Sequence, residues 1–79
     1  GSPLDNLSCM AAMVEGYLRG LGWVNLNHAS LDAVDMAVIM DLTKNSRIAV
    51  NKSHADNYKD ASAYSAIAGE CAEQLYGIK

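Results

Sequence analysis

Two cysteines near opposite ends of the chain, Cys9 and Cys71, place the strongest constraint on how these 79 residues can fold. Cys9 lies near the start of the first amphipathic segment, and Cys71 lies near the end of the last one. A disulfide between them would close a loop of about 60 residues and would stabilise the fold by roughly 4 kcal/mol. This is comparable with the whole stability expected of a domain this small. We therefore predict one disulfide; the alternative is a pair of reduced thiols used as small core residues.

The composition indicates one small domain whose core consists of aliphatic and alanine side chains. About half of the residues (51%) are hydrophobic, yet Phe is absent and the aromatic residues are one Trp and four Tyr. Alanine-rich cores bury little area per residue, so a covalent cross-link would help such a fold. We predict a single helical domain over residues 1–79, in which Gly1-Ser2 is typical of a cloning scar.

The charge balance argues against two classes of partner. The net charge is −3, whereas a general nucleic-acid binder needs a basic patch. The longest compact apolar run, residues 36–40, is far shorter than the ~20 residues that span a bilayer. We therefore expect no nucleic-acid partner and no membrane span. Two cysteines in so small a domain favour an oxidising compartment, which predicts a periplasmic or secreted protein.

Apolar residues that recur every three or four positions predict a first and a last helix. The first can begin with Ser2-Pro3, a capping residue followed by proline, or slightly later with a cap at Asp5, Asn6 or Ser8. Gly20 and Gly22 end it. Gly16 lies inside this helix at a cost of about 1 kcal/mol relative to Ala, which indicates a neighbouring backbone close by. The last helix begins near residues 56–57 and stops at Gly77. The apolar stripe of the first helix consists of Leu7, Ala11, Val14, Leu18 and Leu21.

The middle of the chain predicts the central helix of the fold. Ser30 can cap it, and between Ala33 and Met40 apolar residues cover most of its circumference. The polar run at 43–46 predicts a break or a kink. Residues 44–52 then form a short fourth segment whose pattern does not distinguish helix from extended chain.

The predicted disulfide decides how these helices must be arranged. In an up-down-up bundle the first and third helices are parallel, which would separate Cys9 from Cys71 by about 20 Å. A disulfide requires Cα atoms within about 7 Å of each other. Either residues 44–52 make a fourth segment or the loop at 22–30 crosses over, and a roughly antiparallel bundle of four segments meets the requirement directly. We therefore predict an all-α fold, a small bundle of three long helices plus a short fourth segment, stapled by one disulfide.

Residues that could carry chemistry do not form a recognisable motif. Cys9, Cys71, His28 and His54 have the side chains of zinc ligands, but neither pair has the short local spacing of a zinc motif. The chain contains no CxxC, GxSxG or HExxH motif and no glycine-rich phosphate loop. We expect a non-enzymatic protein with no catalytic residues, no metal and no cofactor.

Methionine and aromatic side chains point instead to binding. Four methionines could line an adaptable apolar groove, and core filling is the alternative role. We expect a protein partner, and a homodimer is consistent with this expectation. The alternative function is a small-molecule or lipid carrier with an apolar cavity between helices. The predicted partner-binding residues are Trp23, Met36, Met40 and Tyr17, and the alternative for Trp23 is that it folds back onto the core as a lid.

Ser8-Cys9, the run Glu15-Gly16-Tyr17-Leu18-Arg19-Gly20 and the late Cys71 resemble small exported bacterial helical proteins. The HdeA-type acid-stress chaperones and some periplasmic immunity proteins of secreted toxins have this build. The resemblance covers about a dozen positions; the long interval between the cysteines and the alanine-rich last helix do not match it. It implies a periplasmic helical protein that acts by binding other proteins, as a chaperone or as an inhibitor, and it implies no catalytic residues.

Overall fold

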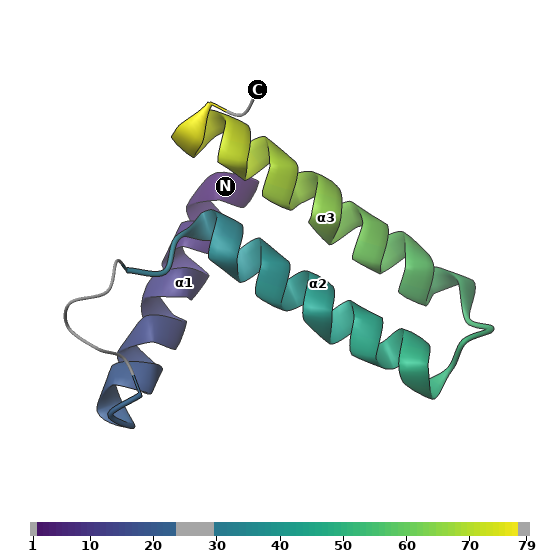
Figure 1. Cartoon of the computed structure of the whole chain (residues 1–79). Helices are drawn as coiled ribbons and strands as arrows, with labels where there is room; N and C mark the ends of the chain where they lie inside the picture. Colours follow the sequence, from purple (N-terminus) through teal and green to yellow (C-terminus); the bar gives the residue numbers. More distant parts are fainter. Residues whose placement is uncertain (1, 24–29, 78–79) are drawn as a thin grey trace.

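The protein is all-α over the residues that the computed structural model describes, 2–23 and 30–77 (Figure 1). Three helices follow one another: α1 (Pro3–Gly20), α2 (Ala33–Val50) and α3 (Ala55–Tyr76). α2 and α3 lie side by side as an antiparallel hairpin, and α1 crosses the end of the hairpin where α2 begins and α3 ends. The predicted fold class and three long helices are confirmed, whereas the arrangement differs from a four-segment bundle.

Side-chain caps define the starts of α1 and α2. The Ser2 hydroxyl accepts a hydrogen bond from the Asp5 backbone N–H at 3.2 Å, which confirms the predicted start of α1. At α2 the cap is Asp32 and not the predicted Ser30. Asp32 and Asp35 each accept a hydrogen bond from the other's backbone N–H at 3.0 Å, which forms a capping box. This reciprocal pair satisfies two N–H groups at once, so the helix begins two residues later than predicted.

Glycines define the ends of α1 and α3, as predicted. Gly22 follows α1 with a φ of 78°, and the next N–H, that of Trp23, donates to the Leu18 carbonyl at 3.0 Å. Gly77 ends α3 with a φ of 64°, and its N–H donates to the Glu73 carbonyl at 3.0 Å. Both are left-handed conformations that residues with a Cβ rarely adopt, so each helix must stop there.

The polar run 43–46 does not break α2, which contradicts the predicted kink. Its side chains donate hydrogen bonds back along the helix, from the Thr43 hydroxyl to the Ile39 carbonyl and from the Asn45 amide to the Asp41 carbonyl, both at 3.0 Å. Polar side chains bonded to the preceding turn lower helix propensity only slightly. The helix therefore continues through them.

The predicted fourth segment, residues 44–52, is wrong as a separate element. It comprises the last two turns of α2 and the start of a short turn into α3. Side chains from α3 form hydrogen bonds with the backbone of this turn. The Asn57 amide donates to the Asn51 carbonyl at 3.1 Å, and the Tyr58 hydroxyl donates to the Lys52 carbonyl at 2.7 Å. These bonds satisfy one carbonyl group at the C-cap of α2, that of Asn51, and one in the turn that follows, that of Lys52.

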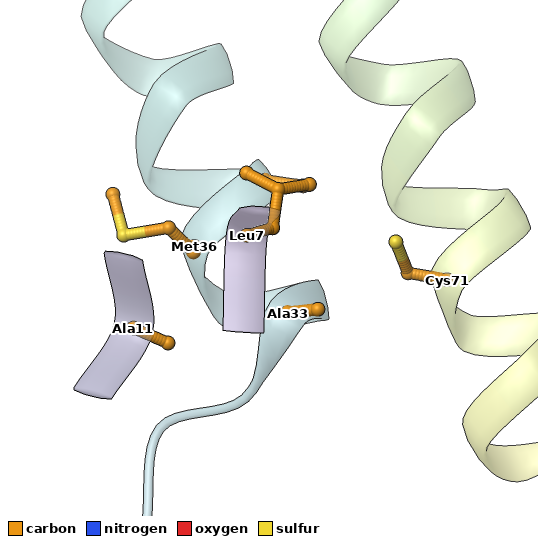
Figure 2. Close-up of a cluster of buried hydrophobic side chains, with 6 residues drawn as sticks. Leu7, Ala11, Ala33, Met36 and Cys71 are labelled. Atoms are coloured by element: carbon orange, nitrogen blue, oxygen red, sulfur yellow. The ribbon is translucent and has the colours of Figure 1, made fainter. Parts of the chain in front are cut away.

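The hydrophobic core lies where α1 crosses the hairpin. Figure 2 shows Leu7 and Ala11 of α1 beside Met36 and Ala33 of α2, with Cys71 on the facing side of α3. Most of these side chains are small, so the helices meet closely but bury little apolar area. The buried residues of this cluster are Leu7, Ala11, Ala33, Met36, Ala37 and Cys71.

The predicted disulfide is wrong: Cys9 and Cys71 are both free. The two ends of the chain do meet, but the residue of α1 that reaches Cys71's cluster is Leu7. Cys9 is two positions further along, which rotates it by about 200° around the helix. It is consequently exposed, whereas Cys71 is 2% exposed. With both thiols free, the cysteines no longer favour an oxidising compartment.

The two thiols should differ sharply in reactivity. We expect iodoacetamide to modify Cys9 rapidly in the native protein and to reach Cys71 only after denaturation, because an interior thiol is shielded from reagents. Intact-mass spectrometry with and without denaturant measures this as one adduct and then two. Adducts that appear in denaturant only after a reductant is added would contradict the assignment of free thiols.

Candidate protein-docking surface

An exposed row of large apolar side chains runs along α1 and past its end. Its helical members recur every three or four residues, so they lie on one side of the helix. Three of its side chains are mostly exposed: Met13 at 70%, Tyr17 at 69% and Trp23 at 76%. We call this row the α1 stripe; it consists of Met10, Met13, Tyr17, Leu21 and Trp23.

The structure separates the four residues that the sequence predicted to bind a partner. Tyr17 and Trp23 lie on the surface, in the α1 stripe, so the expectation that Trp23 covers the core as a lid is wrong. Met36 is 4% exposed, and Met40 is half-buried against the same core cluster. The two methionines of α2 therefore fill the interior, which is the alternative role considered for them, and the two aromatic residues remain available to a partner.

Met10, Met13 and Leu21 were not among the predicted partner-binding residues, yet all three are exposed. Leu21 was expected in the apolar stripe of the first helix, and the two methionines were expected either to line an apolar groove or to fill the core. The width of the apolar side of α1 could have indicated that some of these residues are exposed. Apolar residues cover more of the circumference of α1 than two crossing helices can bury. Leu7 and Ala11 are buried, whereas Met13 and Tyr17 on the adjoining side of α1 are exposed.

Small residues lie next to the α1 stripe. Gly16 and Gly20 are exposed, and a Cβ built on either one meets nothing within 4 Å. The expectation that a neighbouring backbone passes close to Gly16 is therefore wrong within the described part of this chain. The α1 stripe, these small residues and the exposed Cys9 together make a surface without charge. We call it the uncharged face of α1; it consists of Cys9, Met10, Met13, Gly16, Tyr17, Gly20, Leu21 and Trp23.

Glu15 projects from a different side of α1 and fixes the approach to α2. It lies two positions from both Met13 and Tyr17, about 200° around the helix. Its carboxylate accepts a hydrogen bond from the Leu31 N–H at 2.7 Å and pairs with Arg19 at 3.5 Å. The hydrogen bond from Leu31 holds the pKa of Glu15 below its ordinary value of 4.5. Desolvation opposes this effect, and the Ser30 hydroxyl and Arg19 add to it.

This lowered pKa predicts a pH dependence of stability. In the unfolded chain Glu15 has its ordinary pKa of 4.5, and in the folded protein its pKa is lower. Ionised Glu15 therefore stabilises the fold fully above pH 4.5, and this stabilisation is lost as the pH falls through the pKa of the folded state. Glu15→Gln should therefore lower the melting temperature at neutral pH and have little effect in acid. Thermal melts from neutral pH to about pH 3 test this, with Glu70→Gln, an exposed glutamate of α3, as the control. An equal effect of Glu15→Gln at both ends of the range would contradict it.

The residues considered as zinc ligands do not come together. Cys9 lies on the outer side of α1, Cys71 lies in the core, and His54 is exposed at the start of α3. His28 lies outside the described residues. Over 2–23 and 30–77, no three His, Cys, Asp or Glu side chains are grouped so that they could share a metal ion. No helix in these ranges has the length and hydrophobicity to cross a membrane.

Comparison with known proteins assigns the chain to a family. A family model described as "Domain of unknown function (DUF6378)" matches residues 1–72. The chain belongs to this family. The match covers α1, α2 and most of α3, so the matched part of this chain contains both the core crossing and the α1 stripe. Neither a curated protein nor a solved structure matches the chain.

Proposed function

We propose that this DUF6378 protein is a non-enzymatic helical domain that binds a protein partner through the α1 stripe. The observation that carries the proposal is the exposure of Met13, Tyr17 and Trp23, at 70%, 69% and 76%, in one row. Contiguous apolar patches rimmed by other surface residues are typical of protein-interaction sites. Tyr, Trp and Met are also enriched at the centres of such interfaces.

The shape of this surface supports a protein partner over a small ligand. Exposed side chains at spacings of three and four residues on a projecting helix are the pattern by which a helix docks into a groove or against another helix. The carrier alternative has less support. The helices meet on small side chains such as Ala11, Ala33 and Ala37, all 0% exposed, and alanines bring helix backbones close together.

Chaperone-like and inhibitor-like roles are both versions of this proposal. An inhibitor or immunity protein would use the α1 stripe for one tight partner. A chaperone would use it for many partners, to which flexible methionine side chains are suited. The number of different partners captured at the stripe distinguishes these roles.

Site-specific photo-cross-linking tests the proposal in cells that naturally make the protein. Benzoylphenylalanine replaces Tyr17 in one variant and Leu42, an apolar residue of α2 that is 62% exposed, in the matched control. We expect discrete protein adducts from position 17 and none from position 42. No adducts from position 17, or the same adducts from both positions, would contradict the proposal.

A further inference from the structure

We infer that the partner is a second copy of this chain, docked α1 against α1 through the uncharged face. The inference rests on the proposed function, because it names the occupant of the same surface. Three independent features of the chain support it: its excess surface, the absence of charge on this face, and the position of two glycines.

The chain exposes more surface than a compact monomer of its size. Its accessible surface is 5544 Å², whereas a compact monomer of 8.4 kDa is expected to expose about 4,600 Å². Its radius of gyration is 13.9 Å, against about 12 Å for a compact domain of this length. The excess of about 900 Å² is summed over the whole chain and is large enough to include the roughly 800 Å² that each partner buries in a stable interface.

The absence of charge permits self-association at this face. Each copy carries a net charge of −3, so two copies repel one another on average. The uncharged face contains no Asp, Glu, Lys or Arg, and Glu15 is turned away toward the start of α2. Two copies can therefore bring their apolar side chains together here without placing like charges opposite each other.

Gly16 has no explanation within a single copy, whereas Gly20 is the last residue of α1. Neither φ angle is positive, so neither conformation requires glycine, and within residues 2–23 and 30–77 a Cβ on either glycine would meet no neighbour. A glycine inside a helix costs about 1 kcal/mol relative to alanine. Close approach of a helix from outside the chain accounts for that cost, since glycine lets two backbones come together.

The surface is also self-complementary, as a two-fold interface requires. Met13 and Tyr17 form a ridge along α1, and Gly16 and Gly20 form a shallow strip beside it. In a symmetric pair the ridge of each copy packs onto the strip of the other, in the way that ridges fit into grooves between packed helices.

Sedimentation equilibrium over micromolar to millimolar concentrations tests this on the purified chain. We expect a mass of twice 8.4 kDa for the unaltered protein. Met13→Lys places a charge on the ridge and Gly16→Leu fills the strip, so each should raise the dimer Kd by at least about tenfold. Leu42→Lys, at an equally apolar and exposed position of α2, should leave the Kd unchanged. Circular dichroism checks that each variant keeps its helices.

The outcomes separate this inference from the proposed function. A monomer at every concentration would overturn the second copy as partner. A dimer that Leu42→Lys weakens as much as Met13→Lys would overturn the assignment of the face. A monomeric chain that still forms adducts with another protein from position 17 would leave the proposed function standing, whereas a monomer without such adducts would remove both.

Discussion

Leu7→Ala should lower the free energy of unfolding by about 3 kcal/mol, the largest effect of a single truncation in this chain. Leu7 is 5% exposed and is one of two large side chains in the core cluster, with Met36. Its removal opens a cavity in the cluster where, among the described residues, all three helices share buried contacts, and the surrounding side chains relax into that space only in part. A domain this small has little stability beyond that amount.

Urea denaturation followed by circular dichroism measures this effect. The matched control is Leu42→Ala, which truncates a leucine that is 62% exposed on α2 and should change stability by less than about 0.5 kcal/mol. Equal losses from the two substitutions would show that the crossing of α1 is not where the fold is held together.

Ala11→Leu should also destabilise the protein, by about 1–3 kcal/mol, because the crossing has no room for a longer side chain. Ala11 is 0% exposed and faces α2, where Ala33 and Ala37 are equally buried. A leucine there pushes α1 away from the hairpin and loses contacts across the whole cluster.

The neighbouring alanine provides the control for this substitution. Ala12 is exposed on the same helix, so Ala12→Leu has similar local propensity and no packing conflict. Thermal melts of the two variants should differ by several degrees. If Ala11→Leu raised the melting temperature, the crossing would contain free space and the close approach of α1 to the hairpin would be wrong.

The helices themselves were largely predictable because their signals are local. Ser2 at the start of α1, Gly22 after it and Gly77 after α3 act through hydrogen bonds and backbone conformations that span only a few residues. The start of α2 was misplaced because Ser30 and Asp32 both have capping side chains. Only the reciprocal bond with Asp35 makes Asp32 the cap.

The tertiary arrangement was predicted wrongly, because the prediction required a disulfide between Cys9 and Cys71, and both cysteines are free. Requiring Cys9 to meet Cys71 led to a four-segment bundle, although α1 crosses the hairpin at one end. The sequence distance between the two cysteines carries no information about which side of α1 each residue occupies. Leu7, two positions earlier, has the orientation that the prediction assigned to Cys9.

The candidate site was half predictable. Tyr17 and Trp23 are exposed, as a partner-binding role requires, but Met36 and Met40 belong to the interior. Apolar periodicity shows that a helix has an apolar side; it does not show how much of that side another helix covers. The extent of cover depends on the crossing of α1 over the hairpin, which is a property of the tertiary fold.

Peroxide oxidation of the methionines at two protein concentrations tests the pairing of α1 with α1 most directly, because it reports on the docking face itself. Met13 is 70% exposed in a single chain and Met36 is 4% exposed, so Met36 serves as an internal reference. We predict that Met13 reacts slowly in concentrated protein and rapidly after dilution, while Met36 reacts slowly in both. Rapid oxidation of Met13 at every concentration would contradict the account.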